Sequence, residues 1–190
     1  MANRVFLALA HCDDPNVSYS GDEIVAAANY MLPVLWCVAS SESDIVWRDQ
    51  DEDVDEEDAS GVTAYPVLLI QLDAAKQRSR ERRRLFFRVF PRWLDTVYDE
   101  WLTLLDGIDA PYLLVDTSEL WGMGEPDEFE ALLTESVSAF ENDEPRFWTG
   151  LLQQASIELD VSAEELSFDV DAVPYLLRGY EWLRPVPWVE

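Results

Sequence analysis

The feature that most restricts the fold of this chain is an arginine-rich segment that runs into an aromatic stripe. Residues 76–92 hold eight Lys and Arg against one acidic residue, and large apolar side chains then recur every three or four positions as far as Trp101. This spacing predicts an amphipathic helical region over 74–105. Pro91 lies inside the region and is expected to kink the helix or to divide it in two. The stripe consists of Leu85, Phe86, Val89, Phe90, Trp93, Leu94, Val97, Tyr98 and Trp101.

The rest of the chain is strongly acidic. Residues 1–75 carry a net charge of −13 and residues 93–190 a net charge of −20, on either side of the +7 of segment 76–92, so that the net charge is −26. An acidic surface repels phosphate backbones and anionic lipid headgroups, so neither nucleic acid nor membrane is an expected partner. A hydrophobic fraction of 48% with eight Trp excludes a disordered acidic tail, because such tails lack the side chains that form a core.

Apolar runs elsewhere alternate between β-type and helical patterns. Strands are predicted at 5–10, 45–47, 62–72 and 112–115, and Pro66 indicates a sheet edge or a bulge in the third of them. Helices are predicted at 22–31 with Asp22 as N-cap, at 33–38 beginning from Pro33, at 127–140 and at 146–157, followed by an extended strap at 182–190. Strands separated by helices indicate a single α+β domain over 1–190, in which several helices pack on a short, mostly antiparallel sheet.

An acidic run at 49–58 contains eight carboxylates and is predicted to lie in a mobile acidic loop at 48–61. Four roles are open for it: a solvated loop, a cation-binding loop, internal pairing with the arginine-rich segment, or a contact surface for a basic protein. The run lacks the glycine and the spaced terminal Glu of an EF-hand, which disfavours the cation site. The candidate partner-binding residues are Asp49, Asp51, Glu52, Asp53, Asp55, Glu56, Glu57 and Asp58.

The arginine-rich segment has two interpretations. An arginine-rich helix can dock in an RNA groove, but the acidic blocks around this one repel the same phosphates. The preferred interpretation is a solvated helix face that neutralises neighbouring carboxylates, those of the acidic run among them. Its basic residues are Lys76, Arg78, Arg80, Arg82, Arg83, Arg84, Arg88 and Arg92.

No pattern typical of catalysis or cofactor binding stands out. The single His, His11, precedes Cys12, and adjacent side chains on a strand point to opposite faces, so they do not form a catalytic pair. The seven Gly form no dinucleotide-binding or phosphate-binding loop, and one His excludes a two-histidine metal site. We therefore expect no enzyme activity, no cofactor and no metal, although 39 acidic residues leave a carboxylate enzyme as an alternative.

Cysteine usage and the apolar runs favour the cytoplasm. Cys12 and Cys37 are the only cysteines, fewer than a small secreted domain usually carries. The apolar run at 5–10 is too short for a signal peptide. The longest uncharged run, 24–41, has an apolar part shorter than a membrane span needs. The expected location is cytoplasmic.

The N-terminal part of the chain resembles a family of small bacterial immunity proteins. The resemblance rests on Met-Ala-Asn-Arg at 1–4, the strand Val-Phe-Leu at 5–7 and Tyr-Met-Leu-Pro-Val-Leu-Trp at 30–36, and it lacks the Ser-Tyr that begins the strand in the family. That family is associated with polymorphic toxins and interbacterial secretion systems. The resemblance implies a cytoplasmic protein that neutralises a cognate toxin by occluding its active site, and no functional residue is carried over.

The sequence hypothesis is thus a non-enzymatic acidic protein that binds a basic partner, a toxin domain under the immunity interpretation. One alternative is a nucleic-acid mimic that inhibits a DNA-binding or restriction enzyme through rows of carboxylates. Another is an ordinary acidic domain of a salt-adapted organism. Tryptophans such as Trp148 or Trp188 are candidate anchors of a protein interface.

Overall fold

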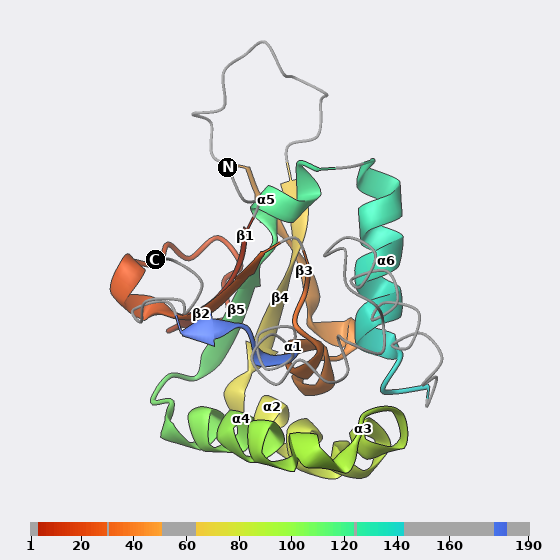
Figure 1. Ribbon diagram of the computed structural model, residues 1–190. Helices are drawn as coiled ribbons and strands as arrows, with labels where there is room; N and C mark the ends of the chain where they lie inside the picture. Colours follow the sequence, from red (N-terminus) through yellow and green to blue (C-terminus); the bar gives the residue numbers. More distant parts are fainter. Residues whose placement is uncertain (1–3, 30, 51–63, 124, 143–176, 182–190) are drawn as a thin grey trace, which may run out of the picture.

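The sheet is six-stranded and antiparallel throughout its described pairs (Figure 1). The computed structural model describes residues 4–29, 31–50, 64–123, 125–142 and 177–181. The strand order is β3-β4-β5-β1-β2-β6. The strands are β1 (Arg4–Ala10), β2 (Ile24–Asn29), β3 (Ile45–Asp49), β4 (Ala64–Gln71), β5 (Tyr112–Asp116) and β6 (Tyr180–Glu181). The predicted α+β class is confirmed.

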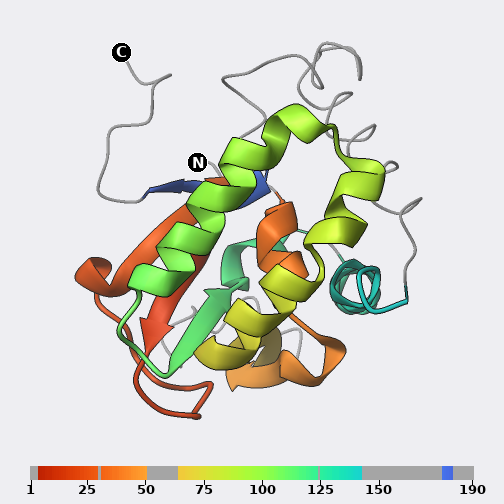
Figure 2. The same cartoon turned by 90° about the horizontal axis from the view of Figure 1, so that it is seen from below.

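The main core lies between the sheet and the helices. Alternate strand residues such as Leu68 and Ile70 of β4 and Leu113 and Val115 of β5 join this core, and all six residues of α1 are buried in it. Seen from below, α1 lies between α4 and α6 (Figure 2). The helices are α1 (Val34–Ala39), α2 (Leu72–Glu81), α3 (Arg83–Val89), α4 (Asp95–Gly107), α5 (Ser118–Trp121) and α6 (Pro126–Ser138).

The aromatic stripe forms helices that break at Pro91, as predicted. α3 ends at Val89, a 3-10 turn covers Arg92–Leu94, and α4 follows. Two buried side chains of α4 bind α2 at one residue: the Tyr98 hydroxyl donates to the carbonyl of Ser79, and Trp101 Nε1 donates to Ser79 Oγ at 3.2 Å. These bonds satisfy the polar ends of two large buried rings, so α4 and α2 pack with their aromatic side chains facing inward.

The helix predicted at 22–31 is wrong. Ser20, not Asp22, caps a single 3-10 turn at Gly21–Glu23, and β2 begins at Ile24. β2 lies between β1 and β6, and its alanines are buried on both faces of the sheet. A strand that is buried on both faces has a continuous apolar sequence without alternation. Periodicity alone does not distinguish such a sequence from that of a short buried helix.

Pro66 lies inside the sheet and not at its edge, because β4 pairs with both β3 and β5. The β4–β5 pairing ends at Leu68 and Val115, so Pro66 falls beyond the last paired residue on that side. A proline is tolerated in an interior strand where no neighbour needs its missing N–H.

The remaining predictions are confirmed, shifted by a few residues, or concern residues outside the described ranges. The strands predicted at 5–10, 45–47, 62–72 and 112–115 and the helices at 33–38 and 127–140 are present within a few residues of their expected bounds. Arg48 and Asp49 belong to β3, so the acidic loop begins later than predicted. Its residues 51–61, the helix at 146–157, the strap at 182–190, Trp148 and Trp188 lie outside the described residues.

We expect Gly179→Ala to destabilise the fold. Gly179 has φ +75°, and a Cβ there would lie 2.7 Å from the Ala27 carbonyl oxygen and 2.9 Å from Trp36 Cζ2. Strain and overlap of this kind cost about 1–3 kcal/mol of unfolding free energy, measurable by urea denaturation. Gly107→Ala, which places its Cβ in open space, is the control, and equal stability of the two variants would contradict the packing of β6 on β2.

Candidate functional site

The first of the predicted partner-binding residues, Asp49, lies on β3, the outermost described strand at one side of the sheet. Asp49 is the last residue of β3, which ends the strand order. Asn16 Nδ2 donates to the Asp49 carboxylate at 2.8 Å, and the Asp49 N–H donates to Asn16 Oδ1 at 2.8 Å. Asn16 therefore holds the end of β3 just before the acidic run. The other candidates lie outside the described residues: Asp51, Glu52, Asp53, Asp55, Glu56, Glu57 and Asp58.

A row of three aromatic side chains starts two residues before Asp49. The rings of Trp47 (β3) and Trp121 (α5) meet edge to face with centroids 6.1 Å apart, and Trp121 meets Phe129 (α6) in the same way at 5.8 Å. Edge-to-face pairs add about 0.5–1.5 kcal/mol of stability beyond the area that they bury. The row therefore links the edge strand to the two helices beside it.

Further exposed apolar side chains occur on or beside the same elements. Trp47 is 46% exposed, Met123 49% and Leu132 45%, and the fourth large apolar side chain exposed in the described residues is Trp93. Exposed aromatic and apolar clusters are typical of protein interfaces, where a few such residues carry most of the binding energy. We define the β3–α6 surface as Trp47, Trp121, Met123, Phe129 and Leu132.

Carboxylates predominate on the elements of the β3–α6 surface. β3, α5 and α6 together carry six acidic residues and one basic residue, Arg48. Arg48 Nη1 lies 3.8 Å from Asp116 Oδ2 of β5, so its charge is paired inside the molecule. The surface therefore combines apolar side chains with unbalanced negative charge, as a binding site for a basic protein requires. The six acidic residues are Asp49, Glu119, Asp127, Glu128, Glu130 and Glu135.

Asp116 is the centre of a partly buried polar cluster on the face of the sheet opposite the helices. Tyr19 donates to its Oδ2 at 2.8 Å, Tyr65 donates to its Oδ1 at 3.4 Å, and the Ser118 N–H donates to Oδ1 at 3.0 Å. Burial and the neighbouring carboxylate raise the pKa of Tyr19, and they raise the pKa of Tyr65 to about 12. Both oxygens of the carboxylate are occupied, so the cluster anchors the segment before β2 to the sheet.

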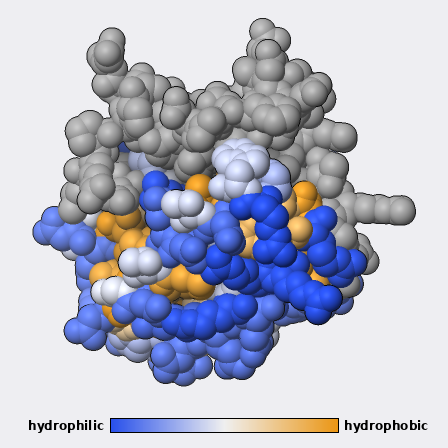
Figure 3. Space-filling model, turned by 60° about the horizontal axis from the view of Figure 1, so that its bottom comes forward, coloured by the Kyte–Doolittle hydropathy of each residue, from blue (hydrophilic) through white to orange (hydrophobic). Residues whose placement is uncertain are grey.

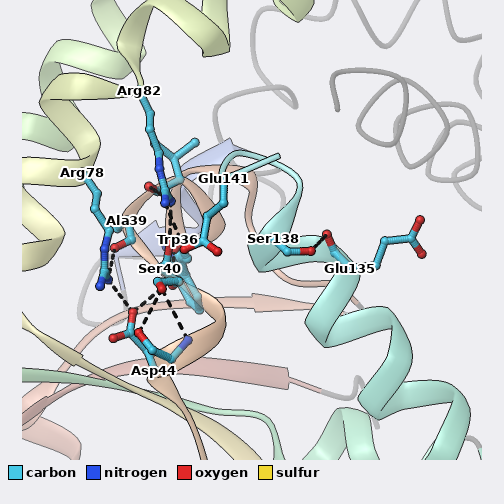
Figure 4. Close-up of polar contacts among 12 residues, drawn as sticks. Trp36, Ala39, Ser40, Asp44, Arg78, Arg82, Glu135, Ser138 and Glu141 are labelled. Atoms are coloured by element: carbon cyan, nitrogen blue, oxygen red, sulfur yellow. Dashed lines mark hydrogen bonds and ion pairs between the residues drawn. The ribbon is translucent and has the colours of Figure 1, made fainter. Parts of the chain in front are cut away.

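The arginine-rich segment binds the C-terminal end of α1 (Figure 4). Arg82 Nη1 donates to the carbonyls of Val38 at 3.0 Å and Ser40 at 2.5 Å, and Arg78 Nη1 donates to the carbonyl of Ala39 at 3.3 Å. The last carbonyls of a helix have no partner within it, and they carry the negative end of its dipole. Two guanidinium groups therefore cap α1 and hold α2 against it.

The same two arginines also form ion pairs. Arg78 Nη1 lies 2.5 Å from Asp44 Oδ2, in the turn before β3, and Arg82 Nη2 lies 3.3 Å from Glu141 Oε1, just after α6. Burial raises the pKa of Asp44 although Arg78 opposes the shift, and burial lowers the pKa of Arg82. α2 is in this way connected to α1, to β3 and to the end of α6.

Further pairs involve the outer arginines. Arg83 Nη2 lies 2.7 Å from Asp95 Oδ1, and Arg83 Nη1 lies 2.5 Å from Asp99 Oδ1. Arg80 Nη2 lies 2.5 Å from Asp106 Oδ1, and all three carboxylates belong to α4. The hydrogen bonds that Arg83 donates to the two carboxylates raise its pKa, and Arg83 lowers the pKa of Asp99. Over these helices the surface is largely hydrophilic with apolar strips between (Figure 3).

Internal neutralisation of the arginine-rich segment is thus confirmed for four of its arginines. Their partners lie on the turn before β3, on α4 and after α6, whereas Asp49, the one described member of the acidic run, binds Asn16. Trp47, Trp121 and Phe129 were not predicted as site residues. Trp47 lies on a short strand and Trp121 on a short helix, and Phe129 lies within a longer helix, so no sequence signal sets them apart from core aromatics.

The chemistry-bearing residues named from the sequence lie apart from this surface. His11 and Cys12 follow β1 and are exposed, with His11 Nε2 3.1 Å from Glu23 Oε1, and Cys37 is buried in α1. Among the described residues no group of three or more His, Cys, Asp and Glu is placed to hold a metal ion. The described helices include none with the length and apolar character to cross a membrane.

We expect Arg82→Ala to lower the unfolding free energy by about 1–3 kcal/mol, because it leaves two carbonyls at the end of α1 without donors and Glu141 without its cation. Arg84→Ala, at an exposed position of the same segment, should change it by less than about 0.5 kcal/mol. Chemical denaturation of both variants measures the difference, and equal values would show that the guanidinium cap does not stabilise the fold.

We expect stability to fall as the pH rises from about 10 to about 12. In the unfolded chain Tyr65 ionises near pH 10, whereas in the folded protein its pKa is about 12. The unfolded state therefore binds fewer protons over this interval, and the unfolding free energy decreases. Urea unfolding at successive pH values should show a smaller decrease for Tyr65→Phe than for the natural protein. An equal decrease would contradict the raised pKa of buried Tyr65 in the folded protein.

The comparison with known proteins assigns no family. No family model, curated protein or solved structure matches the chain. The functional conclusion therefore depends on the side chains described above.

Proposed function

We propose that this protein is a non-enzymatic acidic binding protein that neutralises a basic protein partner, as immunity proteins neutralise bacterial toxins. The partner would be a toxin domain whose active site the acidic protein covers. A toxin that acts on nucleic acid carries positive charge around its substrate cleft, and an acidic surface complements that charge. The cytoplasm, where such toxins act, is the proposed location.

The observation that carries this proposal is the separation of charge. Arg78, Arg80, Arg82 and Arg83 pair with carboxylates of other elements, and Arg48 pairs with Asp116. These cations are therefore occupied within the molecule. The elements β3, α5 and α6 carry six carboxylates and one internally paired arginine, and the acidic run continues directly from β3. Negative charge gathered beside exposed aromatic side chains favours association with a basic protein.

Two features support a binding role over catalysis. Both oxygens of Asp116, the carboxylate nearest to two tyrosines, accept hydrogen bonds from residues of the fold. Burial raises the pKa of those tyrosines above the ordinary value near 10, which moves it further from neutral pH. A group that must exchange protons during a reaction needs a pKa nearer the working pH.

A charge-neutralising triple variant tests the proposal. The candidate partner is the product of the gene next to that of this protein, co-expressed with it in a toxin-sensitive host. Asp51→Asn, Asp53→Asn and Asp55→Asn together should weaken the complex by about tenfold at low salt, and the difference should shrink as salt screens the charges. Isothermal titration at two salt concentrations measures both effects, and growth of the host reports neutralisation.

The matched control changes the same number of charges elsewhere. Asp22→Asn, Asp73→Asn and Asp109→Asn replace exposed carboxylates on other elements. This variant should keep the natural affinity and protect the host. If both triple variants weaken binding equally, the acidic run has no special role. If no basic partner binds and stability instead rises steeply with molar salt, the acidity is an adaptation to salt and the proposal fails.

A further inference from the structure

Pro66 decides which backbone groups of β3 face the open edge. Trp47 lies opposite Pro66 in the β3–β4 pair. The Pro66 carbonyl accepts a hydrogen bond from Thr117 Oγ1 at 2.5 Å, on the β5 side of β4. The N–H and C=O of one residue in an antiparallel strand point the same way, so Trp47 and Pro66 form a non-hydrogen-bonded pair. The N–H and C=O of Trp47 therefore point away from β4, towards the outer edge of the sheet.

The outward-facing backbone N–H groups on either side of Trp47 already have hydrogen-bond partners within this chain. Ile45 and Asp49 lie two residues before and after Trp47 and share its orientation. The Asp49 N–H donates to Asn16 Oδ1, and the Ile45 N–H donates to the carbonyl of Glu42. Within the described ranges the Trp47 N–H has no hydrogen-bond partner. As far as the described residues go, the edge is thus blocked at both ends and open at Trp47.

The same residue presents its side chain to the β3–α6 surface. The Trp47 ring lies on the helix-bearing face of the sheet, where it contacts Trp121 and remains 46% exposed. β3, α5 and α6 lie next to one another (Figure 1), and their exposed carboxylates include Asp49, Asp127 and Glu128. An open backbone pair, an aromatic anchor and negative charge therefore occur together at one strand.

We propose that the edge of β3 at Trp47 receives an extended, basic segment of the partner protein as an additional strand. The backbone of the segment pairs with the N–H and C=O of Trp47, and its apolar side chains pack on the indole ring. Its Lys and Arg side chains reach Asp49 and the carboxylates of α6. Addition of a strand to an open sheet edge is a general mode of protein recognition. This inference rests on the proposed function and specifies its binding mode.

Charge favours a basic partner over a second copy of this chain. Pairing of two β3 edges would bring two sets of these carboxylates together, in molecules that each carry a net charge of −26. Like charges that face each other across an interface oppose association, whereas a basic strand removes the excess.

Amide hydrogen exchange in the protein alone tests the open edge first. We expect the Trp47 N–H to exchange at least about tenfold faster than those of Val46 and Arg48, which pair with β4. Slow exchange of the Trp47 N–H in a monomer would mean that another part of the chain occupies the edge, and a dimer by light scattering would mean that a second copy does. Either result would overturn the proposal.

A peptide titration then tests the occupant. The probe is a short acetylated and amidated peptide of alternating Lys and Val. It should bind and slow the exchange of the Trp47 N–H by about tenfold or more, whereas a Glu-Val peptide should not. Methylation of the peptide nitrogens that pair with Trp47 should abolish binding without any change to the protein. Trp47→Ala should weaken binding by about tenfold, and Trp93→Ala, a second exposed tryptophan, should leave it unchanged.

The outcome is separable from that of the proposed function. Peptide binding that survives nitrogen methylation would overturn strand addition, and an affinity unchanged by Trp47→Ala would overturn the role of the indole ring as its anchor. A toxin domain could still bind this protein in a way that depends on salt and on the acidic run. Conversely, strand addition could hold for the peptide when the product of the neighbouring gene does not bind.

Discussion

The two guanidinium groups at the end of α1 are the contact on which the arrangement of the helices depends. Arg78 and Arg82 donate to the last carbonyls of a helix whose residues are all buried, and buried carbonyls without donors cost stability. The same side chains reach Asp44 before β3 and Glu141 after α6. One pair of arginines thus joins α1, α2, α6 and the edge strand. The arginine-rich segment therefore has a structural role in this fold.

This use of the arginines shapes the surface. With Arg48 of β3 and Arg78 and Arg80 of α2 paired inside the molecule, negative charge remains on β3, α5 and α6, the elements that carry or adjoin Trp47 and other exposed apolar side chains. Protein interfaces combine an aromatic anchor with charges that select the partner. The fold separates its charges in a way that serves such an interface, and this separation supports the proposed binding of a basic toxin.

Periodicity and proline positions predicted much of the fold. The aromatic stripe has the spacing of a helix, and Pro91 predicts the break in it. Strands such as β5 were recognisable as short apolar runs bounded by polar residues. β2 was not predicted, because burial on both faces removes the alternation of a strand. The site was predicted only as far as Asp49. Trp47 and Trp121 come together through the register of β3 and β4 and the position of α5, which local sequence does not encode.

The proposed binding mode places a basic partner on the β3 edge and α6, and not on the arginine-bearing helices. Hydrogen–deuterium exchange of this protein, alone and with the candidate partner encoded by the neighbouring gene, tests this binding mode and is read by mass spectrometry. We expect slower exchange in peptides that cover 45–49 and 126–135, with no change over 76–107. Protection confined to 76–107, with β3 and α6 unchanged, would contradict it.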